Sequence, residues 1–196
     1  TAGILIGEVD RINRSITQLL EFAKPMAVTV KEVDIRELID HSLALVAQDL
    51  KDKEIRARVD IQTLKSTVAT DPDRMNQVLL NLYINAVQAL DPGGALEVTV
   101  TDGPDENGIE IRVADTGPGM DPATADRIFD PYFTTKPTGT GLGLSIVHRI
   151  IDNLGGQIHV ESRVGKGTVF TISLNPEKRL RSNGSDAKGK NRDDIS

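Results

Sequence analysis

Apolar residues recur at alternating intervals of four and three along the first part of the chain, at Leu5, Val9, Ile12, Ile16, Leu19 and Ala23. This spacing predicts a long amphipathic helix with a narrow apolar seam, as in a coiled coil or a helical hairpin. Pro25 ends the helix because proline cannot continue the hydrogen-bond ladder. We expect the seam to pack against partner helices rather than against this chain's own domain.

The next elements follow from capping signals and apolar alternation. Asp34 is a candidate N-cap, and Glu37 three residues on completes a capping box, so a helix is predicted from there to about residue 52. Alternating apolar residues predict strands over 55–61 and 67–70. Asp71 followed by proline begins a helix over 72–90. Residues 26–33 are predicted to be a linker.

The remaining pattern predicts four strands and two helices. Strands are expected over 95–101, 109–115, 157–162 and 168–174, with a short helix near 123–128 and a longer one over 141–154. Their irregular alternation predicts an α/β sandwich of the α+β class, with a mixed sheet of about five strands and three main helices on one face. Residues 34–175 would form this domain, with a flexible lid over 116–140, and the polar tail 176–196 is expected to be disordered.

The helix predicted over 72–90 is apolar nearly all round, yet it carries one polar stripe. The stripe consists of Arg74, Gln77, Asn81, Asn85 and Gln88, spaced by three, four, four and three residues. Solvated helix faces usually carry lysine and glutamate, and asparagine is a poor helix former. The two asparagines four apart therefore favour a face that contacts a ligand over an ordinary solvated face.

Two glycine-rich runs flank the predicted lid. Residues 115–119 (Asp-Thr-Gly-Pro-Gly) follow a strand, and residues 139–143 (Gly-Thr-Gly-Leu-Gly) open a helix. Glycine lets the backbone approach a ligand closely, and the free N–H groups at a helix start attract anions. Together the runs predict a nucleotide site, with the triphosphate at the helix start. Ordinary turns, with Asp115 as a capping aspartate, are the alternative.

Composition removes several other classes of function. The 196 residues suit one domain, and a net charge of −6 without a basic run disfavours nucleic-acid binding. The absence of cysteine excludes disulfides and thiolate metal sites. The sequence has no signal-peptide pattern and no apolar stretch of the ~18–20 residues that a membrane span needs. The chain begins at Thr1 with its first methionine at Met26, so we expect it to be a piece of a longer protein.

Five motifs occur in the order of the N, G1, F, G2 and G3 boxes, at residues 81–86, 115–119, 129–136, 139–144 and 165–168. Through them the chain resembles the catalytic ATP-binding domain of a sensor histidine kinase, in the superfamily of gyrase, Hsp90 and histidine kinase ATPases. Residues 1–25 resemble the second helix of the dimerisation and histidine-phosphotransfer hairpin. The Asp-Pro-Tyr-Phe-Thr-Thr-Lys run is similar to the nitrogen-regulation and metal-responsive sensor branch.

The resemblance implies roles for individual residues toward ATP and Mg²⁺. Asp115 would read the adenine amino group, Asn85 would be the magnesium ligand, and Asn81 and Lys136 would be the catalytic residues at the phosphates. The nucleotide-binding set implied is Asn81, Asn85, Gln88, Asp115, Gly117, Gly119, Lys136, Gly139, Thr140, Gly141, Leu142, Gly143 and Thr168. The aromatic residues of the 129–136 run are expected to dock on a partner surface, here the histidine hairpin.

The acceptor histidine of such a kinase, which is followed by an acid and Asn/Thr-Pro, does not occur in this sequence. His41, His148 and His159 are therefore expected to be surface or half-buried structural residues. The implied activity is that of a protein-histidine kinase acting on a histidine outside this chain. The partners implied are the kinase's own hairpin, in a homodimer of the full-length protein, and a response regulator. A cytoplasmic location is expected, within a parent anchored in the inner membrane by residues absent here.

Three alternatives share parts of this pattern. Gyrase- or chaperone-type ATPases carry an acid at the position of Asn81 to activate water, and an amide cannot accept that proton at neutral pH. A serine-directed anti-sigma kinase is disfavoured by the leading helical seam and by the long 129–136 run. An interaction module that senses ATP without transferring phosphate stays open from the sequence.

Overall fold

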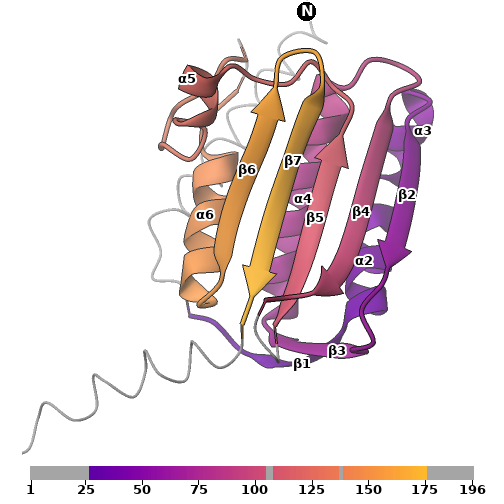
Figure 1. The fold of residues 1–196 in the computed structure, drawn as a ribbon, viewed down its shortest axis with the longest axis vertical. Helices are drawn as coiled ribbons and strands as arrows, with labels where there is room; N and C mark the ends of the chain where they lie inside the picture. Colours follow the sequence, from indigo (N-terminus) through magenta and orange to yellow (C-terminus); the bar gives the residue numbers. More distant parts are fainter. Residues whose placement is uncertain (1–26, 105–107, 137–138, 176–196) are drawn as a thin grey trace, which may run out of the picture.

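Five strands form one mixed sheet in a computed structural model that describes residues 27–104, 108–136 and 139–175. The predicted N-terminal helix and the tail 176–196 lie outside the described residues. The strands, in their order across the sheet, are β2 (Arg56–Ile61), β4 (Ala95–Asp102), β5 (Ile109–Asp115), β7 (Gly167–Leu174) and β6 (Gln157–Arg163) (Figure 1). Only β2 and β4 run parallel, and the other neighbours are antiparallel. The predicted mixed five-stranded sheet is confirmed.

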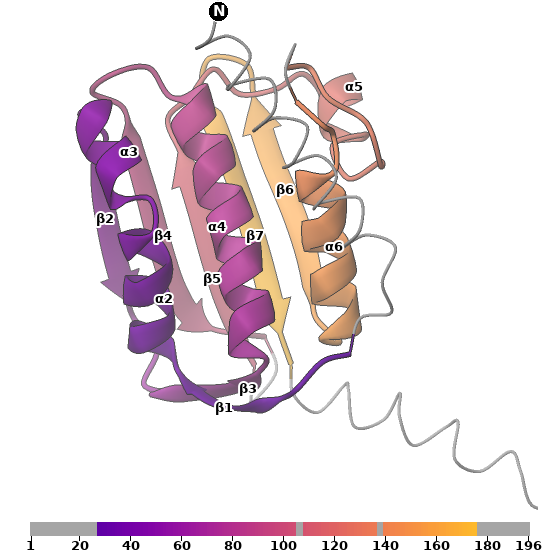
Figure 2. The same cartoon turned by 180° about the vertical axis from the view of Figure 1, so that it is seen from behind.

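Three helices cover one face of this sheet, which confirms the predicted two-layer arrangement. They are α2 (Ile35–Ala44), α4 (Pro72–Ala89) and α6 (Gly143–Asn153), and they lie side by side in Figure 2. Alternate strand residues point toward them and are buried, as with Leu96, Val98 and Val100 of β4. Burial of these apolar side chains, at about 25 cal/mol per Å² removed from water, holds the two layers together.

The helix α4 is the central helix, and Asp71 fixes where it begins. The Asp71 carboxylate accepts hydrogen bonds from the backbone N–H groups of Asp73 and Arg74, both at 3.1 Å. Pro72 occupies the first turn, where its missing N–H costs nothing. The second carboxylate oxygen accepts the N–H of Thr29 at 2.7 Å, which ties the preceding segment to the same point. A cap of this kind stabilises a helix by about 1 kcal/mol.

Two details differ from the sequence prediction. The helix expected from Asp34 to residue 52 is divided into α2 and α3 (Ala47–Asp52). Buried residues continue every four positions across the break, at Leu38, Ser42, Val46 and Leu50, so periodicity could not reveal it. Residues 31–33 of the predicted linker belong to β1 (Lys31–Asp34), which pairs with β3 (Thr67–Thr70) in a separate two-stranded sheet.

Candidate functional site

The polar stripe runs along α4, and its last three members lie on the C-terminal half of this helix, which ends at the upper end of the molecule in Figures 1 and 2, where β5 and β6 also end. Asn81 and Asn85 are half-buried and Gln88 is exposed. The buried residues of the helix are Met75, Val78, Leu79, Leu82, Tyr83, Ala86 and Val87. Three segments from later in the chain meet the C-terminal half of α4. The residues that the sequence analysis singled out are thus gathered around one helix.

The first segment is the lid, which reaches the stripe through Lys136. The Lys136 Nζ donates to Asn85 Oδ1 at 3.1 Å and to Gln88 Oε1 at 2.6 Å. Burial lowers the pKa of the Lys136 ammonium from its ordinary 10.5. The two amide oxygens therefore hold a cation in this position.

The second segment is the start of α6. An ideal Cβ built on Gly143 would lie 3.6 Å from Asn81 Oδ1, so this helix start faces the first asparagine of the stripe. No side chain caps α6, whose N-cap position is Leu142. Its first backbone N–H groups are therefore available to an anion, and the helix dipole favours negative charge at this point.

Two of the glycines before α6 lie within the lid rather than at the helix start. Residues 139–143 were expected to line the helix start, but α6 begins only at Gly143. Gly141 has φ +68°, and a Cβ there would overlap the backbone of Tyr132, whose N–H donates to the Gly141 carbonyl at 3.0 Å. Likewise a Cβ on Gly139 would overlap the Thr134 hydroxyl. These two glycines are needed for the fold of the lid, because a side chain at either position would collide with lid residues 132–134.

The third segment is the loop after β5, which begins with Asp115. The Asp115 Oδ1 accepts the N–H of Gly117 at 2.8 Å. Burial raises the pKa of the Asp115 carboxyl above its ordinary 3.8, and the backbone N–H groups of Gly117 and Thr168 lower it by less. A Cβ on Gly117 would lie 3.4 Å from the carbonyl oxygen of Ala89, so the loop runs against the last turn of α4.

The turn between β6 and β7 holds this loop from its other side. The Gly165 N–H donates to the Pro118 carbonyl at 2.6 Å. A Cβ on Gly119 would overlap the carbonyl of Arg163, and a Cβ on Gly167 would overlap the carbonyl of Asp115. Thr168 is buried and lies in register with Asp115. The contact between the turn and the Asp115 loop is therefore backbone against backbone.

This close approach predicts a large difference between two substitutions in one turn. Gly167→Ala should destabilise the fold by roughly 3 kcal/mol, since φ is +94° and the new methyl group would push against Asp115. Gly165→Ala should cost about 1 kcal/mol, because φ is +74° but nothing lies within 4 Å. Urea unfolding of the two variants measures both values. Equal losses would mean that the Asp115 contact is absent in solution.

The aromatic residues of the lid are divided between the core and the surface. The Phe129 ring lies 5.3 Å from the His148 ring and 6.4 Å from the Phe170 ring, centre to centre. The Arg127 guanidinium lies 4.5 Å above the ring of Phe133. Tyr132 alone among the aromatic residues of the lid is largely exposed, at 62%. The expectation that the whole cluster faces a partner is wrong, because Phe129 and Phe133 pack against the core.

The remaining candidates in the described parts of the chain are the histidines, a metal-binding cluster and a membrane-spanning helix. His41, His148 and His159 are exposed, as expected of surface histidines. No group of three or more His, Cys, Asp or Glu side chains that could hold a metal gathers within residues 27–104, 108–136 and 139–175. Within the same ranges, no helix combines the length and the apolar character that crossing a bilayer requires.

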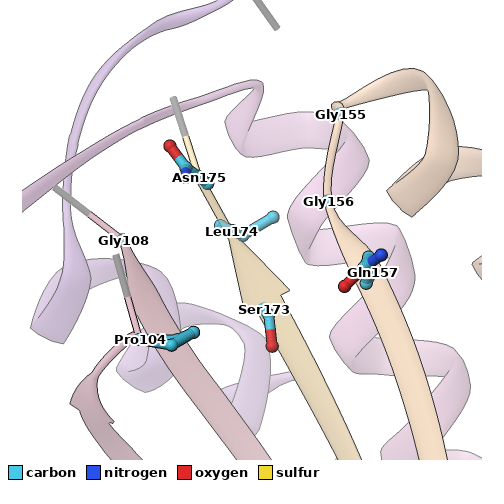
Figure 3. A pocket seen from close by; sticks show the side chains of 8 residues that line it. All are labelled: Pro104, Gly108, Gly155, Gly156, Gln157, Ser173, Leu174 and Asn175. Atoms are coloured by element: carbon cyan, nitrogen blue, oxygen red, sulfur yellow. The ribbon is translucent and has the colours of Figure 1, made fainter. Parts of the chain in front are cut away.

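A hollow at the lower end of the sheet is lined by residues such as Pro104, Gly108, Gly156 and Ser173 (Figure 3). Its enclosed volume is about 50 Å³, which suits a few waters rather than a nucleotide. None of the residues implied for nucleotide binding lines it. The candidate site therefore lies at the other end of the sheet, around α4.

The sequence analysis missed Ser162, the last but one residue of β6. Its Oγ accepts the N–H of Met120 at 2.8 Å and lies 2.9 Å from the hydroxyl oxygen of Thr168. A serine near the end of a strand carries no local signal of such contacts. Only the register of β6 against β7, which sets Ser162 opposite Thr168, could have indicated it.

The chain is similar to known ATPases and histidine kinases. Residues 70–178 match the family described as histidine kinase-, DNA gyrase B-, and HSP90-like ATPase. The sensor histidine kinase ZraS of Escherichia coli strain K12 is 45% identical over 173 residues, which cover 88% of this chain and 37% of ZraS. The chain thus spans less than two fifths of the length of this curated relative.

Solved structures of histidine kinases share the fold. The nucleotide-free catalytic domain of histidine kinase ThkA superposes with a TM-score of 0.70 at 34% identity, covering 77% of this chain and 99% of that domain. Full-length ShkA in complex with AMPPNP gives 0.79 at 29% identity, covering 89% and 37% of the two chains. ThkA in complex with the response regulator TrrA gives 0.76 at 31% identity, covering 90% and 51%.

Proposed function

Because the chain belongs to the family of histidine kinase-, DNA gyrase B- and HSP90-like ATPases, as the catalytic domain of a sensor histidine kinase, we propose how it acts. The site around α4 binds Mg²⁺-ATP and positions its γ-phosphoryl group for transfer to a histidine outside this chain. The observation that carries this proposal is that the lid and the α6 start meet the amide stripe of α4 while the Asp115 loop lies against the last turn of the same helix.

The base end of the nucleotide lies at Asp115. One carboxylate oxygen already accepts the N–H of Gly117, and a carboxylate has further lone pairs for the exocyclic amine of adenine. Gly117, Gly119 and Thr168 form the walls beside it. ShkA, which is similar in fold, was crystallised with AMPPNP, and this supports a nucleotide in the same crevice here.

The metal position lies at Asn85. The hydrogen bonds of the Lys136 ammonium to Asn85 Oδ1 and Gln88 Oε1 support a cation position on this part of the stripe. The amide donors fit Mg²⁺, which needs one or two protein oxygens and takes its other ligands from phosphates and water. When bound, Mg²⁺ would neutralise charge on the β- and γ-phosphates. Because two cations repel one another at short range, a metal held at Asn85 would displace the Lys136 ammonium, which could then contact the terminal phosphates.

The phosphates lie between the stripe and the start of α6. Gly143 supplies an uncapped helix N–H, Leu142 and Thr140 precede it, and Gly139 and Gly141 keep the lid folded beside it. Asn81, which faces Gly143, contacts the phosphates or their bound water. Asn81 and Lys136 act at the reacting group through position and charge, which is the main contribution to catalysis in phosphoryl transfer.

In the transfer itself, an imidazole nitrogen of the acceptor histidine forms a bond to the γ-phosphorus. The bond from that phosphorus to the β–γ bridging oxygen breaks, and ADP leaves. The histidine lies on the kinase's own helical hairpin, in a homodimer of the full-length protein, and a response regulator aspartate then receives the phosphoryl group. The complex of ThkA with TrrA supports the last partner. We place this domain in the cytoplasm, in a parent anchored in the inner membrane.

Labelling with [γ-³²P]ATP tests the proposal. The chain alone should take up no label, because its three histidines lack the acceptor context. A separately supplied histidine-bearing hairpin should be labelled, and the product should be lost in acid, as phosphohistidine is.

The matched control is the same hairpin with its histidine replaced by alanine, which should stay unlabelled. Acid-stable labelling of the chain would indicate serine or threonine chemistry instead. ATP binding without any transfer to the hairpin would favour a nucleotide-sensing module.

A further inference from the structure

A small hydroxyl network connects the Asp115 loop to the turn between β6 and β7. At its centre is Ser162, which is half-buried on the helix-facing side of β6 and pairs with Thr168 of β7. The Ser162 Oγ lies 2.8 Å from the Met120 nitrogen, 3.1 Å from the Gly167 carbonyl oxygen and 2.9 Å from Thr168 Oγ1. One side chain thus contacts the loop, the turn and the neighbouring strand.

The protons in this network can be assigned by counting donors. The Met120 N–H donates to Ser162, and the Gly167 carbonyl can only accept. A serine hydroxyl has one proton, so Ser162 donates it to Gly167. The Thr168 hydroxyl must then donate to Ser162, because otherwise one of the three short contacts would join two lone pairs. All three contacts are satisfied only in this arrangement.

The assignment determines what Thr168 offers to its surroundings. With its proton committed to Ser162, the Thr168 oxygen has only lone pairs left. Thr168 lies in register with Asp115, whose carboxylate also accepts hydrogen bonds. Asp115 and Thr168, which face each other on adjacent strands, therefore both offer acceptor oxygens. This pattern suits an exocyclic amine, as in adenine, and repels a carbonyl oxygen, as in guanine.

We propose that Ser162 is a positioning residue for base discrimination, which holds the Asp115–Met120 loop in place and keeps Thr168 an acceptor. Ser162 does not touch the nucleotide in this arrangement and acts through Met120 and Thr168. The inference rests on the proposed function, since it names a residue that makes the ATP site selective for adenine.

The test is calorimetric binding of ATP, GTP and inorganic tripolyphosphate to the chain and to three variants. Ser162→Ala, which removes all three contacts of the hydroxyl, should weaken ATP binding about tenfold and lower the ATP-to-GTP affinity ratio by a similar factor. Tripolyphosphate affinity should stay the same, because the phosphates lie at α6. Ser162→Thr, which keeps the hydroxyl, should restore the ATP-to-GTP ratio.

Ser173→Ala is the matched control. Ser173 is a half-buried hydroxyl on β7 that bonds to Glu110 at the opposite end of the sheet, where Figure 3 shows it. This variant should bind all three ligands as the unaltered chain does. Thermal melting of each variant ensures that binding is measured on folded protein.

The outcomes separate the two proposals. If the unaltered chain prefers ATP and Ser162→Ala keeps that preference, the role of Ser162 is refuted while the ATP site stands. A parallel loss of ATP and tripolyphosphate affinity also refutes it, because Ser162 would then support only the fold. If the unaltered chain binds no ATP, the proposed function fails and the inference falls with it.

Discussion

Asp115→Asn should weaken ATP binding by at least about 100-fold, measured by calorimetry at neutral pH. The single oxygen of asparagine is needed for the N–H of Gly117, which Asp115 Oδ1 accepts at 2.8 Å. The new amide NH₂ would then face the exocyclic amine of adenine, donor against donor. Losing a charge-assisted hydrogen bond and leaving unpaired donors in a half-buried crevice accounts for a loss of this size.

The same substitution should leave the stability of the ligand-free chain unchanged or increase it. Burial raises the pKa of Asp115, so the neutral carboxyl is the form that the fold favours. A group with a raised folded-state pKa contributes stability at pH below its unfolded value and loses that contribution as the pH rises through the folded value. At neutral pH the Asp115 charge therefore opposes folding, and asparagine removes it. Thermal melting of the two ligand-free proteins measures this difference.

The pH dependence of binding provides a further readout of Asp115. As the pH falls, the carboxylate should be protonated at a pH above the ordinary 3.8 and cease to be a charged acceptor, so ATP affinity should fall. Asp115→Asn should lack this component. Asp102→Asn, at the exposed end of β4 and at the opposite end of the β4–β5 pair from Asp115, is the matched control and should bind ATP normally. An Asp115→Asn variant with unaltered affinity would refute the base-reading role.

Asn85→Ala should remove the magnesium dependence of triphosphate binding. In the unaltered chain, Mg²⁺ should increase ATP affinity, because Asn85 Oδ1 supplies a protein ligand while the phosphates and water supply the others. Without that oxygen, ATP should bind with the same low affinity in Mg²⁺ and in EDTA. Calorimetric titration in both conditions measures the effect. Loss of a metal ligand typically costs more than tenfold in affinity.

The control for Asn85→Ala is Gln77→Ala, which removes an amide from the same stripe two turns earlier. Gln77 Oε1 accepts a hydrogen bond from the Arg74 guanidinium at 3.1 Å, and Gln77 lies two turns before Asn85, to which Lys136 donates. Its magnesium dependence should match that of the unaltered chain. Full magnesium dependence in Asn85→Ala would instead show that the metal is held by another residue.

The polar stripe shows which features of the site helix periodicity could predict and which it could not. Spacing by three and four placed Asn81, Asn85 and Gln88 on one face of α4 correctly, because one helix fixes the direction of its own side chains. It could not show that Lys136, about fifty residues later, donates to two of them. Such long-range contacts depend on how the intervening strands bring the lid back to α4.

The glycine runs show the same limit. The sequence correctly indicated that the backbone needs glycine there, since a positive φ or a close approach excludes side chains. It assigned Gly141 to the helix start, whereas Gly141 packs against Tyr132 within the lid. Which surface a glycine approaches is decided by tertiary packing, and no local pattern encodes it.

Local patterns alone determined the class of fold, the central helix with its cap, the aspartate at the end of β5 and the order of the five motifs, because each depends on residues close together in the chain. The tertiary structure alone decided that Lys136 lies on the stripe, that Phe129 faces inward and that Ser162 joins two strands to the Asp115 loop. These contacts join residues distant in sequence, and their energies are realised only when the layers pack.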